Sequence, residues 1–259
     1  MGRTGLARLV QDVPMNLDLL TIRLRKLAAI AVQSSYRGAF LRHGVAPAIE
    51  HEAVLRGLDF DFVVDVGANR GQFSLVCRHV RPRAQIVSFE PLPGPAAIYR
   101  ALFEGDPRVR LQACALAPQR GEMTMHVSNR EDSSSLLPIS ALQSENFPGT
   151  ESVGVTSVPV GPLSDFLRPD DLGRQNLLKI DVQGFELEVL KSAEPLLPRF
   201  RWIYAECSSV PLYEGQALAD EVIQWLKIRQ FDLVGRFNPS RGRDGTPLQA
   251  DLLFQLRAV

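Results

Sequence analysis

Cysteine, histidine and long apolar runs are all scarce in this sequence. Its three cysteines, Cys77, Cys114 and Cys207, are far apart, and the chain has four histidines in 259 residues. No C-x-x-C spacing occurs, which disfavours both a disulfide framework and a zinc site. No segment approaches the ~20 consecutive apolar residues that a membrane-spanning helix needs. The sequence therefore predicts a cytoplasmic protein without a transmembrane segment.

Net charge is absent as well. Lysine and arginine number 29, aspartate and glutamate number 29, and the formal charge is zero. Because nucleic-acid binding depends on excess positive charge, we expect no nucleic-acid partner. The apolar content of 45% and the charged content of 22% are ordinary for a globular domain. Composition therefore leaves the function to be argued from motifs.

The most informative stretch is residues 60–80. An apolar, β-branched run ending at Val66 predicts a buried strand, Gly67, Ala68 and Gly71 predict a tight turn, and residues 72–80 are typical of a helix. Glycine permits close approach of a ligand, and the N–H groups of a helix start favour an anionic group. This strand, glycine loop and helix predict a site for a nucleotide-like cofactor.

Two acids indicate which cofactor. Asp65 at the strand end suits a cationic ligand, and Glu90, after the next apolar run, can accept hydrogen bonds from both hydroxyls of a ribose. The spacing from Gly67 to Gly71 also differs from the G-x-G-x-x-G of dinucleotide-binding loops. These features favour S-adenosylmethionine (SAM), which has an ammonium group and an unphosphorylated ribose. NAD stays open, because its ribose also binds an acid.

Strand and helix patterns alternate from Leu55 onward. They predict an α/β, Rossmann-like domain over residues 51–259 with a mostly parallel, doubly wound sheet. Residues 1–50 are expected to form an N-terminal helical extension. Apolar residues recur there at helical spacing from Leu17 to Ala31, Asn16 or Asp18 suits the helix start, and Gly44 the end. This helix is a cap on the domain, a homo-oligomer contact, or a peripheral contact with the inner face of a membrane.

Four predicted strands end on an acid: Asp65, Glu90, Asp181 and Glu206. Because ligands bind outside the carboxyl ends of strands in an open α/β sheet, we expect the four acids to share one cleft. Asp181 and Glu206 are the candidate catalytic pair. The polar loop of residues 129–135 is either a plain connection or a rim of this cleft.

Several motifs together resemble the FkbM family of SAM-dependent methyltransferases: residues 65–74, 89–91 and 178–186, and Glu206 with residues 211–215. The similarity runs from about Leu55 to the C-terminus. It implies a class I methyltransferase fold and O-methylation of hydroxyls, commonly on sugars of glycolipids, polysaccharides and secondary metabolites. The expected cofactor-binding residues are Asp65, Gly67, Ala68, Asn69, Gly71, Phe73, Glu90 and Pro91.

The expected function is therefore SAM-dependent methyl transfer to a hydroxyl of a small-molecule or glycan acceptor. An NAD-dependent oxidoreductase and a non-catalytic SAM-binding interaction module are the alternatives. One residue departs from the family pattern, because Gln183 stands where a glutamate is common. Some related enzymes use a divalent metal. If this chain binds Mg²⁺, Asp181 and Glu206 are the expected ligands. Without a metal, Asp181 is the expected general base and Glu206 its partner.

Overall fold

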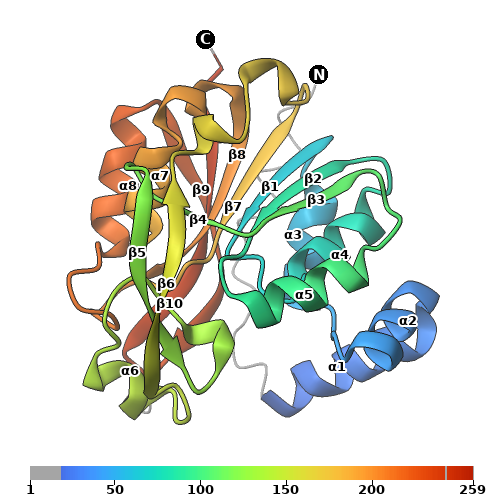
Figure 1. The fold of residues 1–259 in the computed structure, drawn as a ribbon, viewed down its shortest axis with the longest axis horizontal. Coiled ribbons are helices and arrows are strands. Elements are labelled where there is room, and N and C mark those ends of the chain that lie inside the picture. The colour runs from blue at the N-terminus through green and yellow to red at the C-terminus, as the bar shows by residue number, and fades with distance from the viewer. Residues whose placement is uncertain (1–18, 243, 259) are drawn as a thin grey trace.

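A seven-stranded sheet forms the centre of the molecule (Figure 1). The computed structural model describes residues 19–242 and 244–258. The strands of the main sheet, in spatial order, are β3 (Val109–Gln112), β2 (Gln85–Phe89), β1 (Phe62–Val66), β7 (Asn176–Ile180), β8 (Phe200–Ser208), β10 (Pro247–Leu256) and β9 (Phe231–Arg241). The pairs from β3 to β8 are all parallel, whereas β10 runs antiparallel to both β8 and β9. The predicted Rossmann-like, mostly parallel sheet is confirmed.

Both faces of the sheet are covered by apolar residues. Val63 and Val64, neighbours in β1, are fully buried in two different core clusters. Successive side chains of a strand point to opposite faces, so a strand buried on both faces needs a continuous apolar run. The helices are α1 (Leu19–Val32), α2 (Ser34–His43), α3 (Glu52–Gly57), α4 (Gln72–Val80), α5 (Pro93–Leu102), α6 (Ala141–Asn146), α7 (Glu186–Ser192) and α8 (Ala219–Ile228).

A second, three-stranded sheet lies beside the main one (Figure 1). It consists of β4 (Ala115–Leu116), β6 (Ser152–Gly161) and β5 (Gly121–Ser128). β5 and β6 pair antiparallel, with Gly121 opposite Val160. The chain leaves the edge of the main sheet after Gln112 and pairs with β6 at Ala115, so β3 and β4 are separate strands in different sheets. The two sheets together enclose one of the apolar cores.

The N-terminal segment forms two helices where one was expected. The backbone of Gln33 is extended, which separates α1 from α2, and Gly44 ends α2 in the left-handed conformation with φ +66°. The proposed start at Asn16 or Asp18 lies outside the described residues. Tyr36 of α2 is fully buried, and its ring centroid lies 4.9 Å from that of His79 in α4. These contacts match the capping interpretation, while the domain boundary after residue 50 stays a prediction.

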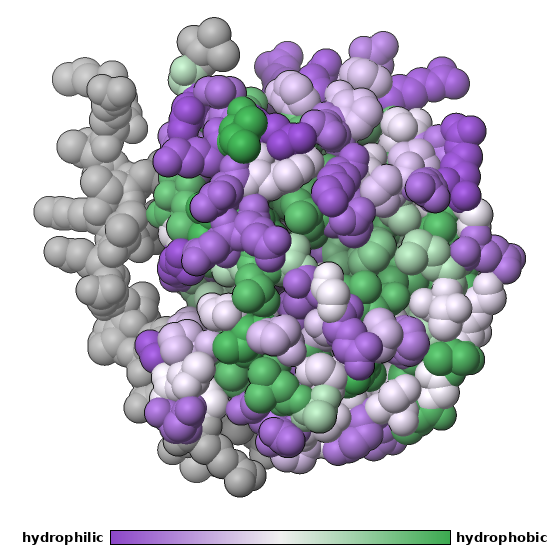
Figure 2. All heavy atoms as spheres, turned by 90° about the vertical axis from the view of Figure 1, so that its left-hand side faces the viewer, coloured by the Kyte–Doolittle hydropathy of each residue, from purple (hydrophilic) through white to green (hydrophobic). Residues whose placement is uncertain are grey.

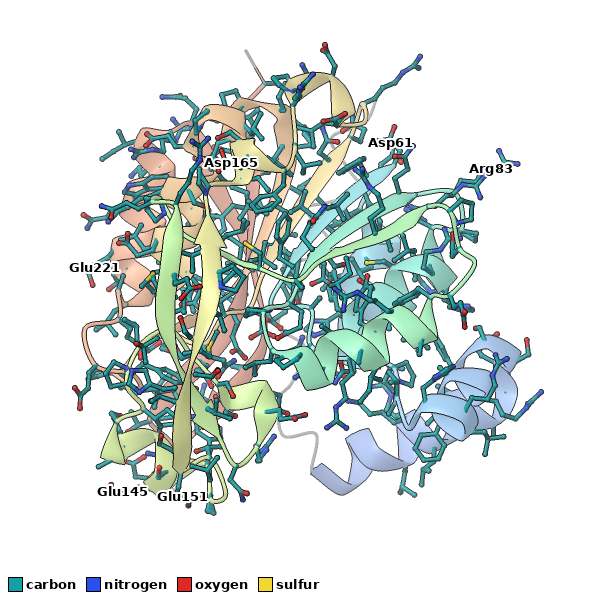
Figure 3. The ribbon with its side chains drawn as sticks, in the orientation of Figure 1. Asp61, Arg83, Glu145, Glu151, Asp165 and Glu221 are labelled. Atoms are coloured by element: carbon teal, nitrogen blue, oxygen red, sulfur yellow. The ribbon has the colours of Figure 1, made fainter. Side chains whose placement is uncertain are left out.

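Most charged side chains point outward, as Asp61, Glu145 and Glu221 do in Figure 3. The face turned toward the viewer in Figure 2 carries scattered hydrophobic side chains among hydrophilic ones. Single exposed apolar residues of this kind need no partner. No helix in the described ranges is long and apolar enough to cross a membrane. In contrast to the outward-pointing charged side chains, some carboxylates are buried at the carboxyl edge of the sheet, and their burial requires an explanation.

Candidate functional site

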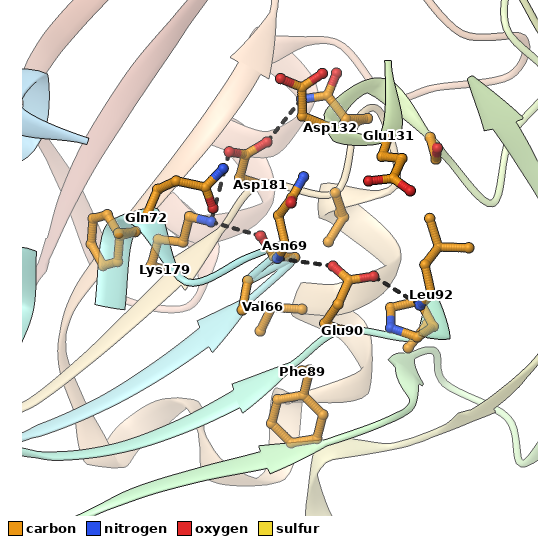
Figure 4. A pocket seen from close by; sticks show the side chains of 18 of the residues that line it. Val66, Asn69, Gln72, Phe89, Glu90, Leu92, Glu131, Asp132, Lys179 and Asp181 are labelled. Carbon is orange, nitrogen blue, oxygen red and sulfur yellow. Dashed lines mark hydrogen bonds and ion pairs between the residues drawn. The ribbon is translucent and has the colours of Figure 1, made fainter. Parts of the chain in front are cut away.

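A cavity of about 280 Å³ opens at the carboxyl ends of β1, β2 and β7 (Figure 4). The glycine loop, the segment after β2 and the segment after β7 contribute to its wall. Two further parts of the wall come from the N-terminal segment and from the polar loop of residues 129–135. The rim interpretation of that loop is therefore the correct one, since Glu131, Asp132 and Ser134 line the cavity.

The glycine loop is shaped by packing as much as by the cavity. Gly67 has φ +74°, and a Cβ there would lie 1.8 Å from the carbonyl oxygen of Asp181. Gly71 has φ +94°, and its Cβ would lie 2.8 Å from the ring of Phe103. Because a side chain would be strained at both positions and would also collide, each glycine brings two segments of backbone together. Gly67 lines the cavity and Gly71 does not.

The N–H groups of this loop serve the protein itself. Those of Gly67 and Ala68 both donate to the carbonyl oxygen of Phe89, at 3.0 Å each. That of Asn69 donates to Oε2 of Glu90 at 2.9 Å. A loop that binds a pyrophosphate group keeps such N–H groups free for the phosphates. The N–H groups of Gly67, Ala68 and Asn69 are therefore not free to bind a phosphate.

Glu90 lies between two backbone donors at the cavity wall. Its Oε1 accepts from the N–H of Leu92 at 2.8 Å, opposite the bond from Asn69 (Figure 4). The side chain is 6% exposed. Burial raises the pKa of Glu90 to about 7, although the two backbone N–H groups and the charge of Lys179 lower it. Each carboxylate oxygen keeps further lone-pair capacity, so the group can still accept hydrogen bonds from a ligand.

Asp65 occupies a different place from the one expected. It lies one residue before the end of β1, opposite Ser88 and Lys179 of the neighbouring strands, and is fully buried away from the cavity. Its carboxylate accepts from the hydroxyl of Ser74 at 2.7 Å and lies 3.2 Å from Nζ of Lys179. Strand alternation directs the side chain to a face of the sheet and not to its edge. The cation that Asp65 meets is thus the protein's own lysine.

Lys179 is the residue that the sequence interpretation missed. Its ammonium group lines the cavity, donates to the carbonyl oxygen of Gly67 at 3.1 Å and lies 3.7 Å from Oδ2 of Asp181. Burial alone would lower the pKa of Lys179, but the carboxylates of Asp65 and Asp181 raise it above its usual range. The signal was a single lysine inside the apolar run of residues 177–180. A buried charge of this kind requires a partner.

Asp181 and Glu206 are joined by one amide group. Nε2 of Gln183 donates to Oδ1 of Asp181 and to Oε2 of Glu206, both at 2.8 Å. The hydroxyl of Tyr213 donates to Oε1 of the same glutamine at 2.8 Å and fixes its orientation. Tyr213 is therefore a core residue, fully buried beneath the site. Asp181 lines the cavity, and its side chain is 38% exposed.

Glu206 does not reach the cavity, which corrects the expectation of four acids in one cleft. It lies inside β8 and not at the end of the strand, opposite Asp251 of β10. Burial raises the pKa of Glu206 well above its usual range, and the nearby Asp181, Asp251 and Glu186 add to this effect. Glu206 therefore holds a proton more readily than an ordinary glutamate, and it contacts Asp181 through the amide group of Gln183.

The predicted Mg²⁺ site does not fit these residues. The Asp181 and Glu206 carboxylates both accept from an amide N–H group, which is a donor and cannot bind a cation. Within residues 19–242 and 244–258, no group of three or more His, Cys, Asp or Glu side chains is arranged to hold a metal ion.

The rim loop is held at both ends. The hydroxyl of Ser135 donates to the carbonyl oxygen of Gln183 at 2.6 Å, and the hydroxyl oxygen of Tyr213 lies 3.0 Å from the carbonyl oxygen of Ser133. Above the cavity, Nη2 of Arg70 pairs with Oε2 of Glu131 at 2.7 Å. The loop is therefore attached through Ser135 to the segment after β7 and through Glu131 to the glycine loop.

Glu186, in the first turn of α7, is a second buried acid near the site. Its Oε1 accepts from the N–H groups of Gly184 at 2.9 Å and Val182 at 3.4 Å. Burial raises the pKa of Glu186 to about 7 despite these bonds. Because this value exceeds the ordinary 4.5, the folded state favours the protonated form. The stabilisation is complete below pH 4.5 and is lost as the pH rises through 7.

We expect Glu186→Gln to remove this dependence, because the amide oxygen can accept both backbone bonds without a charge. The free energy of unfolding of the variant, relative to the wild type, should rise by about 2 kcal/mol between pH 5 and pH 8. Urea denaturation at several pH values measures this difference. Glu188→Gln, on the exposed face of α7, is the control. A difference between Glu186→Gln and the wild type that stays constant with pH would contradict the raised pKa.

The cavity brings together six of the eight predicted cofactor-binding residues: Gly67, Ala68, Asn69, Phe73, Glu90 and Pro91. Asp181 joins them, while Asp65, Gly71 and Glu206 lie behind the wall. The binding role of each lining residue stays a prediction. Residues that no motif indicated complete the wall, among them Lys26, Glu50 and His51 from the N-terminal segment.

Comparison with known proteins gives consistent matches. The profile of the methyltransferase FkbM domain matches residues 65–233. The 2-O-methyltransferase NoeI of Sinorhizobium fredii is 31% identical, covering 72% of this chain and 77% of its own. The 31-O-demethyl-FK506 methyltransferase FkbM of Streptomyces tacrolimicus is 29% identical, covering 85% and 91%. Among solved structures, TehB from Haemophilus influenzae aligns with a TM-score of 0.48 at 9% identity, covering 86% of this chain and 67% of that one.

Proposed function

This chain belongs to the FkbM methyltransferase family, and from that membership we propose that it is a SAM-dependent O-methyltransferase. The acceptor we propose is a hydroxyl of a sugar in a glycolipid, a polysaccharide or a glycosylated metabolite. The observation that carries the proposal is the Glu90 carboxylate, oriented by two backbone N–H groups at the wall of an acid-lined cavity.

The residues of the cavity fit SAM in three respects. Glu90 can accept from the two ribose hydroxyls. Apolar side chains suited to a purine ring line the same region: Leu92, Ala115, Leu116, Met125 and Leu136. Carboxylates exceed lysines in the lining, with Glu50, Glu90, Glu131, Asp132 and Asp181 against Lys26 and Lys179. An excess of carboxylates favours a cofactor that carries a positive sulfonium.

The use of the glycine-loop amides argues against NAD. A dinucleotide places its pyrophosphate against free N–H groups at a helix start. Here the N–H groups of Gly67, Ala68 and Asn69 already donate to Phe89 and Glu90. SAM has no phosphate and makes no such demand. The loop therefore favours SAM over the dinucleotide.

Bound SAM supplies a methyl group attached to a sulfonium sulfur, and this sulfur is a good leaving group. The work left to the protein is to align the acceptor hydroxyl with that methyl and to remove its proton. Alignment can contribute ~7–11 kcal/mol to catalysis. We assign the alignment to Asp181, whose Oδ1 is held by Gln183 and whose Oδ2 faces Lys179. A carboxylate held in this way can accept a hydrogen bond from a hydroxyl without moving.

Calorimetric titration of the full chain with SAM, S-adenosylhomocysteine and NAD tests the cofactor. We expect the first two to bind and NAD not to bind. Transfer of a radiolabelled methyl group from SAM to a panel of methyl hexopyranosides then tests the acceptor class. Binding of NAD alone would overturn the proposed function. Binding of SAM without methyl transfer to any hexopyranoside would overturn the proposed sugar acceptor.

We expect Asp181→Asn to retain SAM binding and to lower kcat/KM for methyl transfer by about 10²-fold, because misplacement of a reacting group costs rates of that order. A radiolabel assay of methyl transfer beside a calorimetric titration with SAM measures both quantities. Asp170→Asn, at an exposed position remote from the cavity, is the matched control. Unchanged kcat/KM in Asp181→Asn would remove Asp181 from the mechanism.

A further inference from the structure

A second polar cluster lies behind the wall of the cavity. It consists of His51, Tyr204 of β8, Asp251 of β10 and Asn238 of β9. The hydroxyl of Tyr204 lies 3.0 Å from both Nδ1 of His51 and Oδ2 of Asp251. The Asp251 oxygen lies 3.5 Å from Nδ1 itself. Tyr204 and Asp251 are 2% and 8% exposed, so the cluster is shielded from solvent.

The hydrogen bonds indicate which nitrogen of His51 carries the proton. Asp251 accepts from Nδ2 of Asn238 at 2.7 Å and from the hydroxyl of Tyr204. Nδ2 of Asn238 lies 3.3 Å from both the Tyr204 oxygen and Nδ1 of His51. The Tyr204 oxygen is closer to Nδ1, at 3.0 Å, and its own proton is directed to Asp251, so we assign the proton of this contact to Nδ1 of His51. Nε2 is then the ring nitrogen with a lone pair. No residue within the described ranges forms a hydrogen bond with Nε2.

His51 is one of the residues that line the cavity, and its side chain is 16% exposed. Its ring packs edge-on against Phe73, with the ring centroids 5.4 Å apart. The ammonium group of Lys179 lies over the Phe73 ring, 5.4 Å from its centroid. Asp181 and Lys179 line the same cavity. A histidine with one nitrogen oriented by a tyrosine and a buried acid behind it, and with the other nitrogen available as an acceptor, has the arrangement of a general base.

We propose that His51, positioned by Tyr204 and Asp251, is the general base that takes the proton of the acceptor hydroxyl. This rests on the proposed function and deepens it. The hydroxyl proton moves to Nε2, the oxygen lone pair forms the new O–CH₃ bond, and the electrons of the broken S–CH₃ bond remain on sulfur. The imidazolium that results is balanced by Asp251, and Asp181 keeps its role in alignment.

The charges around His51 are compatible with this step. Burial raises the pKa of Asp251, and a positive charge on His51 acts in the opposite direction. The two groups therefore stabilise each other's charged form. Glu50, the preceding residue, is paired with Lys26 of α1 at 3.1 Å, and both line the cavity. His51 and Asp251 both lie outside the segment that matches the family profile, residues 65–233.

The activity test compares His51→Gln with the wild type in methyl transfer from SAM to the methyl hexopyranoside that is turned over fastest. We expect kcat to fall by about 10²–10⁴-fold, as for loss of a positioned base, and the acidic limb of the kcat–pH profile to disappear. The Kd for SAM should not change. Tyr204→Phe should lower kcat by less, at unchanged KM. His43→Gln, at the end of α2 and away from the cavity, is the control. Wild-type kcat in His51→Gln would overturn the proposal.

A second measurement needs neither cofactor nor acceptor. Heteronuclear NMR of the histidine rings in the full chain, with His51 assigned by its loss in His51→Gln, reports which ring nitrogen carries the proton. We expect Nδ1–H in the wild type and a shift toward Nε2–H in Asp251→Asn. A proton on Nε2 of the wild type would overturn the proposal. If no hexopyranoside is methylated, the proposed acceptor class is wrong. The NMR measurement then still tests whether Nε2 of His51 is the nitrogen without a proton.

Discussion

Glu90→Gln should weaken the binding of SAM by at least about 10²-fold, because a hydrogen bond to a charged group contributes about 1.5–3 kcal/mol and a ribose offers two. The substitution keeps the size of the side chain. The glutamine leaves one acceptor for two backbone donors, because its Nε2 is itself a donor and cannot accept from the N–H of Asn69 or Leu92. Urea denaturation of the same variant separates the two effects, because loss of a hydrogen bond in the wall lowers the free energy of unfolding and loss of the ribose contacts does not.

The pH dependence of this effect follows from the raised pKa of Glu90. Since the pKa is about 7, the carboxylate is mostly protonated at pH 6 and mostly ionised at pH 8. Hydroxyl groups donate better to the ionised form, so the affinity of the wild type for SAM should rise across this interval. Glutamine does not titrate, so the part of this rise that comes from position 90 should be absent in the variant.

Calorimetry at pH 6 and pH 8 with SAM and S-adenosylhomocysteine makes both comparisons. Glu104→Gln, an exposed acid just beyond α5, is the control. Equal affinities of Glu90→Gln and the wild type at pH 8 would show that the ribose does not contact this carboxylate.

Lys179→Met should destabilise the folded protein by about 3–5 kcal/mol, because removal of one partner from a buried ion pair leaves the other charge uncompensated. Asp65 is fully buried and would keep only the hydroxyl of Ser74 as a donor. Urea denaturation at neutral pH measures the loss. Lys191→Met, which removes an exposed lysine paired with Glu188 at 2.6 Å, should cost less than about 1 kcal/mol.

The double variant Asp65→Asn with Lys179→Met separates the pair from the packing. Replacement of both charges of a buried pair is often nearly neutral, so the double variant should regain most of the lost stability. If the double variant is as unstable as Lys179→Met alone, the lysine matters for reasons other than the charge of Asp65.

The sequence predicts the parallel core of this fold well, because those strands are local and strongly patterned. Residues 72–80 form a helix with the expected bounds, and the apolar run before Glu90 forms β2. Apolar runs buried on both faces and a turn with two glycines at positive φ have few alternative structures. Glu90 and Asp181 follow their strands directly and lie at the sheet edge for the same reason.

The parts that could not be predicted depend on contacts between distant segments. Whether an acid near a strand end faces the edge or a face is decided by where the strand stops, and Asp65 and Glu206 both lie inside their strands. Lys179 is recognisable as a partner of Asp65 only when β7 is placed beside β1. His51 meets Asp251 across 200 positions of the chain, which no local pattern records.

The place of β10 has a consequence for how the protein is made. It comes last among the strands along the chain, yet it lies between β8 and β9, inside the sheet. During synthesis, β9 emerges first and has no neighbour to pair with until residues 247–256 follow. A ribosome-bound intermediate would therefore carry two unsatisfied strand edges. The sheet is therefore completed, and the Asp251 carboxylate is placed in it, only when β10 pairs with β8 and β9.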